Sequence, residues 1–460
     1  MPRLRRTLTI LGGSAAALLA FTAAVGGWTY AQLGATPGEL MDYAERRLEG
    51  HTKLEWVALP AIGVVRDLLD QPSKVAMRKM PFEVPRPPPL KRIEVSVASL
   101  SPERVNQRIL RVGPEREIRT IAQAAKLAQD GDLVIVDAGN YYGDVAVWHQ
   151  KKLTLRAVGG NARLFANGKS AEGKAIWVIR SGDFTIENFD FVGTHVTDRN
   201  GAGIRFEAGS LHVSNCLFFG NDSGLIVSSG ATSVRIDNSE FAYNGFGAGY
   251  SHSLYVNKIK SLTVTSSYFH HANIGHHIKS RAQQNHIAYN RITDETGGRA
   301  SYEIDLPNGG LATVLGNIVQ QGAQAQNSTL ISYGAEGLVW PANRLYLASN
   351  TLVNDHPYGG TFIRTAPGTQ RFVAVNNLMV GPGRWFGGPL APENLNNNGA
   401  TWSDFVKASR YDYRLSADGK AKLPYTKPAM PELEPLHNYR DTALAPAIGG
   451  PAYLPGAMSR

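Results

Sequence analysis

Hydrophobic and polar positions alternate in short runs along most of the chain, and these runs recur on a nearly fixed period. From residue 184 onward, an apolar residue is followed by a polar or small residue and then by a large apolar residue that closes a strand. The closing positions are Phe191, Phe218, Phe241, Phe269, Ile292, Val319, Leu352 and Met379. They are 27, 23, 28, 23, 27, 33 and 27 residues apart, which predicts one structural repeat per interval.

Each repeat also holds an earlier short strand, at residues 204–206, 254–256, 277–279, 303–305 and 361–363. Alternation with a period of two buries one side of such a strand and exposes the other. The repeats are too short for a four-stranded propeller blade and lack the fixed leucines of a leucine-rich repeat. The chain is therefore predicted to be all-β, a single-stranded right-handed parallel β-helix.

Asparagines occupy fixed places in these repeats. They stand three residues before the closing position at Asn188, Asn215 and Asn238, and two residues before it at Asn290, Asn317, Asn350 and Asn377. Asparagine tolerates left-handed backbone geometry, and its side chain can bond a stacked neighbour at a turn. We expect these residues to be structural, and we expect the single cysteine, Cys216, to be an inert core residue.

The two ends of the chain follow other patterns. Residues 1–31 hold three arginines and then the uncharged run Leu8–Trp28, which predicts a hydrophobic helix that serves as a cleaved export signal or an uncut membrane anchor. Residues 36–94 predict a short helical segment and a Pro-rich linker, residues 95–420 the β-helix, and residues 421–460 a Pro-rich tail. The protein is therefore expected to be exported, to the periplasm or the cell envelope.

Charge and composition exclude several functions. The net charge of +9 is not gathered into a basic stripe, so no nucleic-acid partner is predicted. One cysteine excludes an intrachain disulfide and a multi-cysteine metal site. The spacing of His270-His271 and His276-His277 matches no standard zinc motif, so no metal site is predicted either. A capped solenoid has few free edges, and the chain is expected to be a monomer.

Chemically competent residues concentrate on three consecutive coils. They are His252, Tyr255, His276, His277, Lys279, Arg281, Glu303 and Asp305. Coils stack roughly 4.8 Å apart, so the exposed residues of successive first strands would form one patch. Elimination from a uronate needs a cation for the carboxylate, a base for the carbon-bound proton and an acid for the leaving oxygen.

Several assignments of these roles are open. Arg281 or His277 would neutralise the carboxylate, Lys279 would be the base, and Tyr255 or His252 the acid. Return of the proton to the opposite face would give epimerisation instead. Glu303 and Asp305 lie two apart on one strand, with alpha carbons roughly 6.6 Å apart, a separation that also suits a glycoside hydrolase.

The surroundings of the cluster suggest substrate contacts and an inert alternative. Tyr333, Glu336, Arg364 and Trp385 are candidates for extending a sugar-binding groove, because aromatic faces stack on sugars and arginines bind carboxylates. The acids and bases would otherwise form an ion-pair ladder between coils, worth about 0–1 kcal/mol for each exposed pair.

The start and end of the solenoid resemble the pectate-lyase superfamily. The similarity rests on the run from Ile118 to Ala128, the segment from Asp130 to Val136 with Gly139-Asn140-Tyr141, and the closing segment from Tyr411 to Leu415. It covers roughly residues 110–420. In that superfamily a short helix caps the first coil, so the resemblance implies an N-terminal capping helix before the β-helix.

Part of the chemical cluster is similar to polysaccharide lyase family six. Lys279-Ser280, Asn285, Asn290, the segment from Glu303 to Gly310 and Asn317 carry this similarity, with Lys279 at the position of the family's lysine base. Leu306-Pro307 stand where the family has an arginine. Ala272 and Ile274 stand where it has calcium-binding glutamates, so no cofactor is predicted.

Together these observations predict a carbohydrate-active protein whose partner is a polysaccharide, and they favour an acidic one. The expected reaction is β-elimination or C5 epimerisation. Two alternatives remain open: a glycoside hydrolase that uses Glu303 and Asp305, and a non-catalytic scaffold that binds polysaccharide during envelope assembly.

Overall fold

The computed structural model describes residues 82–90, 107–247, 249–389 and 392–436, together with Met41, Ala58, Ile62, Gly456 and Ala457. The predicted signal or anchor at Leu8–Trp28 lies outside these residues, as does most of the helical segment at 36–94. No helix in the described part is long and apolar enough to cross a membrane.

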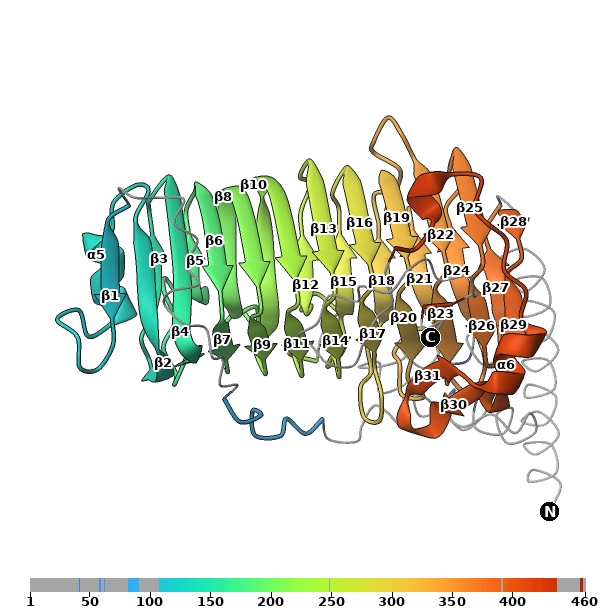
Figure 1. Ribbon diagram of the computed structural model, residues 1–460, viewed down its shortest axis with the longest axis horizontal. Coiled ribbons are helices and arrows are strands. Elements are labelled where there is room, and N and C mark those ends of the chain that lie inside the picture. Colours follow the sequence, from blue (N-terminus) through green and yellow to red (C-terminus); the bar gives the residue numbers. More distant parts are fainter. Residues whose placement is uncertain are drawn as a thin grey trace, which may run out of the picture.

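The chain winds into an elongated parallel β-helix in which each coil contributes strands to three faces (Figure 1). The first face is made by β3 (Ala146–Trp148), β5 (Ala175–Ile179), the starts of β8 (Ala202–Ser214) and β10 (Ser223–Asp237), β12 (Leu254–Val256), β15 (His276–Ser280), β18 (Tyr302–Leu306), β21 (Thr329–Tyr333), β24 (Thr361–Thr365) and β27 (Arg384–Gly387). Every pairing among β1 to β29 is parallel, which confirms the predicted all-β parallel β-helix.

The other two faces follow each first strand in turn. The second face comprises β1 (Ile109–Val112), the starts of β2 (Leu133–Tyr142) and β4 (Lys152–Phe165), β6 (Asp183–Glu187), the ends of β8 and β10, β13 (Ser261–Thr265), β16 (Gln284–Ala288), β19 (Leu311–Leu315), β22 (Arg344–Ala348), β25 (Arg371–Val375) and β28 (Glu393–Leu395). The third comprises the ends of β2 and β4, β7 (Phe189–Val192), β9 (Leu217–Phe219), β11 (Glu240–Ala242), β14 (Tyr268–His270), β17 (Arg291–Thr293), β20 (Ile318–Gln321), β23 (Thr351–Asn354), β26 (Leu378–Val380) and β29 (Asn398–Ala400).

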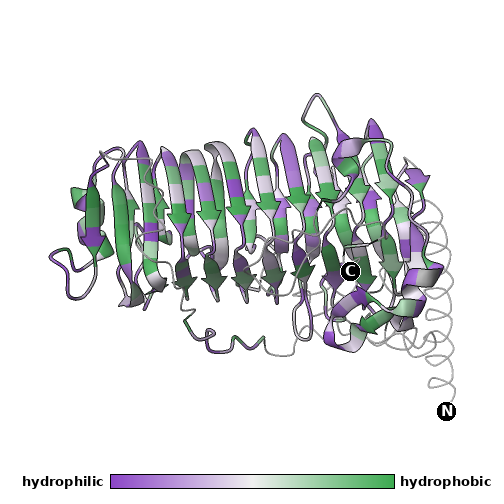
Figure 2. Ribbon diagram, viewed as in Figure 1, coloured by the Kyte–Doolittle hydropathy of each residue, from purple (hydrophilic) through white to green (hydrophobic). Residues whose placement is uncertain are grey.

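The predicted closing residues pair directly with one another on the third face, from Phe191 through to Met379. Phe191, Phe218, Phe241 and Phe269 stack face to face, with ring centroids 4.5 to 5.1 Å apart. The apolar residues of the first strands pair in the same way and fill the other side of one continuous core. Hydrophobic positions therefore recur at the same level of successive strands (Figure 2).

The two ends of the solenoid differ in structure. Helix α5 (Ile121–Leu127) lies at the first coil, where Thr120 caps it and Ile121, Ala124 and Ala125 are buried. The last coil is followed by an antiparallel pair, β30 (Phe405–Lys407) and β31 (Asp412–Leu415), and by helix α6 (Ala417–Lys422). Three short 3-10 helices, η2 (Trp402–Asp404), η3 (Ala408–Arg410) and η4 (Pro431–Leu433), complete this end.

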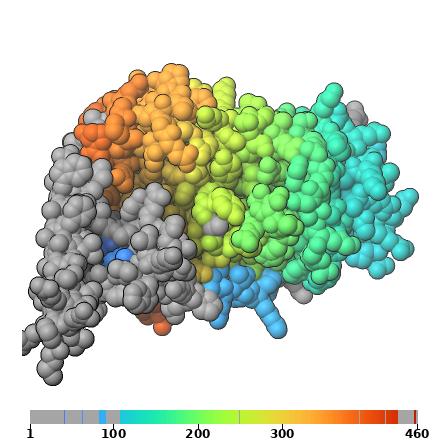
Figure 3. Space-filling model, turned by 180° about the vertical axis from the view of Figure 1, so that it is seen from behind, coloured from blue at the N-terminus to red at the C-terminus, as the bar shows by residue number. Residues whose placement is uncertain are grey.

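The proline-rich segment at residues 82–90 contains no helix or strand, in agreement with its prolines, and lies along the outside of the coils (Figure 3). Arg163 on β4 donates a hydrogen bond of 2.7 Å to the carbonyl of Pro88. The Arg299 guanidinium lies over the Phe82 ring. These contacts hold this part of the linker against the third face.

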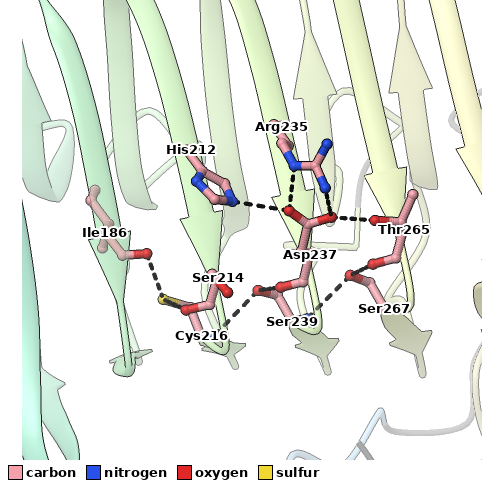
Figure 4. Close-up of polar contacts among 9 residues, drawn as sticks. All are labelled: Ile186, His212, Ser214, Cys216, Arg235, Asp237, Ser239, Thr265 and Ser267. Carbon is pink, nitrogen blue, oxygen red and sulfur yellow. Dashed lines mark hydrogen bonds and ion pairs between the residues drawn. The ribbon is translucent and has the colours of Figure 1, made fainter. Parts of the chain in front are cut away.

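The predicted asparagines have two separate structural roles. Asn188, Asn215 and Asn238 adopt left-handed backbone geometry, with φ of 68°, 52° and 48°. The residues that follow this position form a buried polar column of Cys216, Ser239, Ser267, Asn290, Asn317, Asn350 and Asn377, which ends at the half-buried Asn397. Each member's backbone N–H donates to the side-chain oxygen of the next member, one coil further along (Figure 4 shows Cys216, Ser239 and Ser267).

Candidate functional site

One row of side chains crosses the outward side of the first face. Strand register aligns it as Tyr255, Lys279, Asp305, Ser332 and Arg364, each on a successive coil. Alternation places these residues outward because their neighbours Leu254, Ile278 and Ile304 belong to the core. The structure therefore aligns Tyr255, Lys279 and Asp305 as the repeat predicted.

Glu336 bridges two cations above this row. Its carboxylate lies 2.8 Å from Lys279 Nζ and 2.6 Å from an Arg281 Nη, while 44 % of its side chain remains exposed. The turn after β21 positions it, and its backbone N–H donates to the carbonyl of Pro307. Burial would raise the pKa of Glu336, but the bonds from Lys279 and Arg281 outweigh it and lower that pKa.

Neighbouring polar groups hold the Arg281 guanidinium in place. Its Nη1 donates to Asn308 Oδ1 at 2.8 Å, and its Nε donates to the Tyr255 hydroxyl at 3.3 Å. Its main-chain carbonyl accepts a hydrogen bond from the indole of Trp340. A guanidinium fixed on several sides binds a carboxylate with little loss of side-chain entropy.

Asp305 lies below these groups and is 2 % exposed. One of its carboxylate oxygens is 3.3 Å from Lys279 Nζ and 3.3 Å from His276 Nδ1. Burial raises the pKa of Asp305, and the nearby Lys279 charge opposes that rise. Lys279 therefore lies between a buried carboxylate and the exposed carboxylate of Glu336.

Three aromatic rings support the end of the row at Tyr255. His252 stacks on Tyr255 and lies beside His276, with ring centroids 5.6 and 4.7 Å apart. The backbone N–H of His276 donates to His252 Nδ1 at 3.1 Å, so any proton on that neutral ring lies on Nε2. Burial, followed by the charge of Lys279, lowers the pKa of His252 to about 3, and the ring is neutral at pH 7.

His277 and Glu303 belong to a second group of side chains. With Asp294 they form a fully buried triad, in which His277 Nε2 is 3.3 Å from Asp294 Oδ1 and 3.4 Å from Glu303 Oε2. Neither oxygen of Glu303 has a hydrogen-bond partner among the described residues. Burial, and then the charge of Asp294, raises the pKa of Glu303 well above its usual value.

The predicted substrate contacts occupy different environments. Tyr333 is 1 % exposed, and its hydroxyl donates to the carbonyl of Gly310 at 2.5 Å, so its ring packs in the core and does not face a sugar. Arg364 is exposed at the far end of the row. Trp385 is partly buried against the core.

Three functional candidates in this region were not identified from the sequence. Asp294 follows strand β17 and so lies outside the first strands, on which the predicted cluster stands; its position two residues after the closing residue Ile292 was the available signal. Asn308 and Ser332 were missed because short polar residues are common at turns and on strand surfaces. The structure brings Asn308 to Arg281 and places Ser332 in the outward row.

No protein-family model matches the chain, and no curated protein sequence does so. Among solved structures, it is similar to pectate lyase Pel9A, with 15 % identity, a TM-score of 0.48, and coverage of 77 % of this chain and 96 % of that one. It is also similar to a pectin methylesterase mutant in complex with a hexasaccharide, with 11 % identity, a TM-score of 0.30, and coverage of 70 % and 99 %.

A third similar structure is ORF18 of Geobacillus virus E2, with 12 % identity, a TM-score of 0.33, and coverage of 59 % of this chain and 53 % of that one. The strand pairing of this chain establishes the parallel β-helix directly. The narrower similarity to polysaccharide lyase family six stays a prediction.

Proposed function

We propose that this protein acts on an acidic polysaccharide, by β-elimination or C5 epimerisation, at the outward row around Lys279 and Arg281. The observation that carries the proposal is the position of Glu336, whose carboxylate bridges both cations. A uronate carboxylate has the same charge and geometry as that side chain. Glu336 therefore marks a carboxylate-binding site that a substrate would enter by displacing it.

The neighbouring side chains are positioned to act as the neutralising cation, the base and the acid of this reaction. Arg281 would hold and neutralise the substrate carboxylate, which favours removal of the proton on the adjacent carbon. Lys279, released from Glu336, would first pass one ammonium proton to the Asp305 carboxylate, 3.3 Å away, and its neutral amine would then take the proton from carbon. The Tyr255 hydroxyl, 3.3 Å from Arg281 Nε, would donate a proton to the leaving oxygen as the carbon–oxygen bond breaks.

Epimerisation needs the same first step and a different ending. The Tyr255 hydroxyl, whose proton exchanges with water, would then protonate the opposite face of the same carbon, and no bond in the polysaccharide backbone breaks. Export of the protein to the periplasm or cell envelope belongs to this proposal, because polysaccharides of this class are encountered there.

The hydrolase alternative has less support from the geometry. Glu303 is fully buried and faces His277 and Asp294, whereas a glycosidase needs both carboxyls at the scissile bond. A non-catalytic binding role needs only the carboxylate site, so product analysis separates it from the enzymatic proposal.

The test uses the full-length chain with a panel of polyuronates and a neutral glucan as the control substrate. Mass spectra of the products detect unsaturated fragments, and reactions in heavy water detect deuterium at the epimerised carbon. We expect one of these signals with a polyuronate and neither with the glucan. Intact, unlabelled chains across the panel would contradict an enzymatic role.

Two variants test the carboxylate site itself. Arg281→Gln should lower kcat/KM by about 10²- to 10³-fold, as loss of a preorganised charge-stabilising donor does elsewhere. Glu336→Gln should lower KM, because it removes the internal competitor. Arg344→Gln, at an exposed position on β22, is the matched control and should leave both constants unchanged.

A further inference from the structure

The buried triad of His277, Asp294 and Glu303 has no part in the proposed reaction, yet it gathers three ligand-type side chains in the interior. His277 comes from β15 and Glu303 from β18, the next strand on the first face. Asp294 comes from the segment that follows β17. One ligand atom from each lies within 4.8 Å of the other two.

The second observation is that Glu303 is buried without hydrogen bonds. Its side chain is 0 % exposed, and neither carboxylate oxygen has a hydrogen-bond partner among the described residues. Such a group costs several kcal/mol in a protein interior unless a cation or a proton compensates it. Asp294 adds a second carboxylate at the same point, which increases the need for compensation.

His277 Nε2 makes a hydrogen bond of 3.3 Å with Asp294 Oδ1, and this contact and the one to Glu303 are both long for bonds between an imidazole and a carboxylate. A charge-assisted N–H···O bond is usually about 2.7–2.9 Å long, whereas His277 Nε2 is 3.3 and 3.4 Å from the two carboxylates. One ring nitrogen also carries only one proton, so it cannot donate fully to both oxygens.

The same distances suit ligands around one metal ion. A tetrahedral zinc ion, with ligands about 2.05 Å away, separates neighbouring ligand atoms by about 3.3 Å. Octahedral magnesium would bring them to about 2.9 Å, and calcium prefers oxygen ligands to imidazole. The backbone N–H of Ala300 donates to both oxygens of Asp294, at 2.9 and 3.1 Å, and fixes this ligand from behind.

We propose that His277, Asp294 and Glu303 bind a zinc ion that ties strand β15 to strand β18. Lys279 and Asp305 follow His277 and Glu303 by two residues on the same strands, so the ion would lie beside the outward row. It would stabilise the register of the coils that carry the outward row. This proposal does not depend on the reaction assigned to that row.

The first test is metal analysis of the full-length protein, purified without chelators from zinc-supplemented cells. We expect about one zinc per chain. Glu303→Gln should lower that content at least tenfold. The matched control is Glu207→Gln, which replaces a glutamate on β8 that already bonds Arg180 and Lys174, and it should retain the zinc.

Thermal unfolding gives a second readout, because bound zinc and a shared proton predict different changes in Tm. If zinc is bound, a strong chelator lowers the Tm of the parent chain by on the order of 5 °C and leaves that of Glu303→Gln unchanged. If a shared proton compensates the carboxylates instead, Glu303→Gln retains or raises the Tm and the chelator has no effect. That result, or stoichiometric manganese or calcium in place of zinc, would overturn the proposal.

Discussion

The buried polar column and the buried triad both place polar side chains away from water, and they differ in how far hydrogen bonds compensate that burial. In the column, Asn317 accepts from Asn290 and donates to the carbonyl of Ile287 and to Asn350, so its amide is fully bonded inside the core. In the triad, the Glu303 carboxylate is equally buried and has no hydrogen bond within the described residues. In a repeat, identical polar side chains can stack and hydrogen-bond to one another. A buried polar group without such a partner therefore points to a bound ligand.

The largest effect should come from breaking the column. Asn317→Ala removes the acceptor for the backbone N–H of Asn290 and leaves the carbonyl of Ile287 without this donor. Each buried group left unpaired costs about 1–3 kcal/mol, so we expect roughly 3–5 kcal/mol of destabilisation. Calorimetry measures the change in unfolding.

The control for this variant is Asn140→Ala, at an exposed position on β2 that lies outside the column. It should change stability by less than about 0.5 kcal/mol. Similar losses for the two variants would show that the column adds nothing beyond an ordinary surface amide.

A smaller effect should come from a buried carboxylate that does have partners. Asp237 accepts from His212, Arg235 and Thr265 (Figure 4), and these bonds outweigh burial and lower its pKa. Because the folded pKa is depressed, its stabilisation is present above the unfolded pKa of about 3.9 and is lost as pH falls through the folded pKa.

Asp237→Asn should therefore cost about 1–3 kcal/mol at pH 7 and progressively less below pH 4. Urea unfolding of both chains across this pH range measures the difference. A difference that stays constant down to the lowest pH would show that the charge of Asp237 contributes nothing.

The smallest effect should come from Cys216→Ser. Ser239 and Ser267 occupy the same column and donate to the carbonyl two residues earlier, each at 2.9 Å, and the Cys216 thiol lies 3.3 Å from the equivalent carbonyl of Ser214. Serine should fit this geometry and change the unfolding free energy by less than about 1 kcal/mol. A loss of several kcal/mol would show that the sulfur fills core volume that a hydroxyl cannot.

The fold was well predicted from the sequence because the same hydrophobic pattern recurs in successive coils. The residues from Phe191 to Met379 mark eight consecutive coils, and a slip of one residue would turn each of them toward solvent. The site was harder to predict, because alternation alone cannot show that Glu303 is covered while Glu336, from a turn, reaches back to Lys279. The groups around Glu303 and the contact of Glu336 with Lys279 both involve residues from different coils. The pattern within one coil carries no signal for such contacts.

The column also has a direction. Each backbone N–H in it bonds forward, to a side chain that lies 20 to 33 residues later in the chain. During translation, a coil therefore leaves the ribosome before the side chain that accepts the hydrogen bond from its column N–H has been made. That hydrogen bond can form only after the following coil is synthesised. If the coils fold in order from the N-terminus, each would complete its column hydrogen bond about one coil behind synthesis. The series ends at Asn397 in the last coil, before the antiparallel pair of β30 and β31.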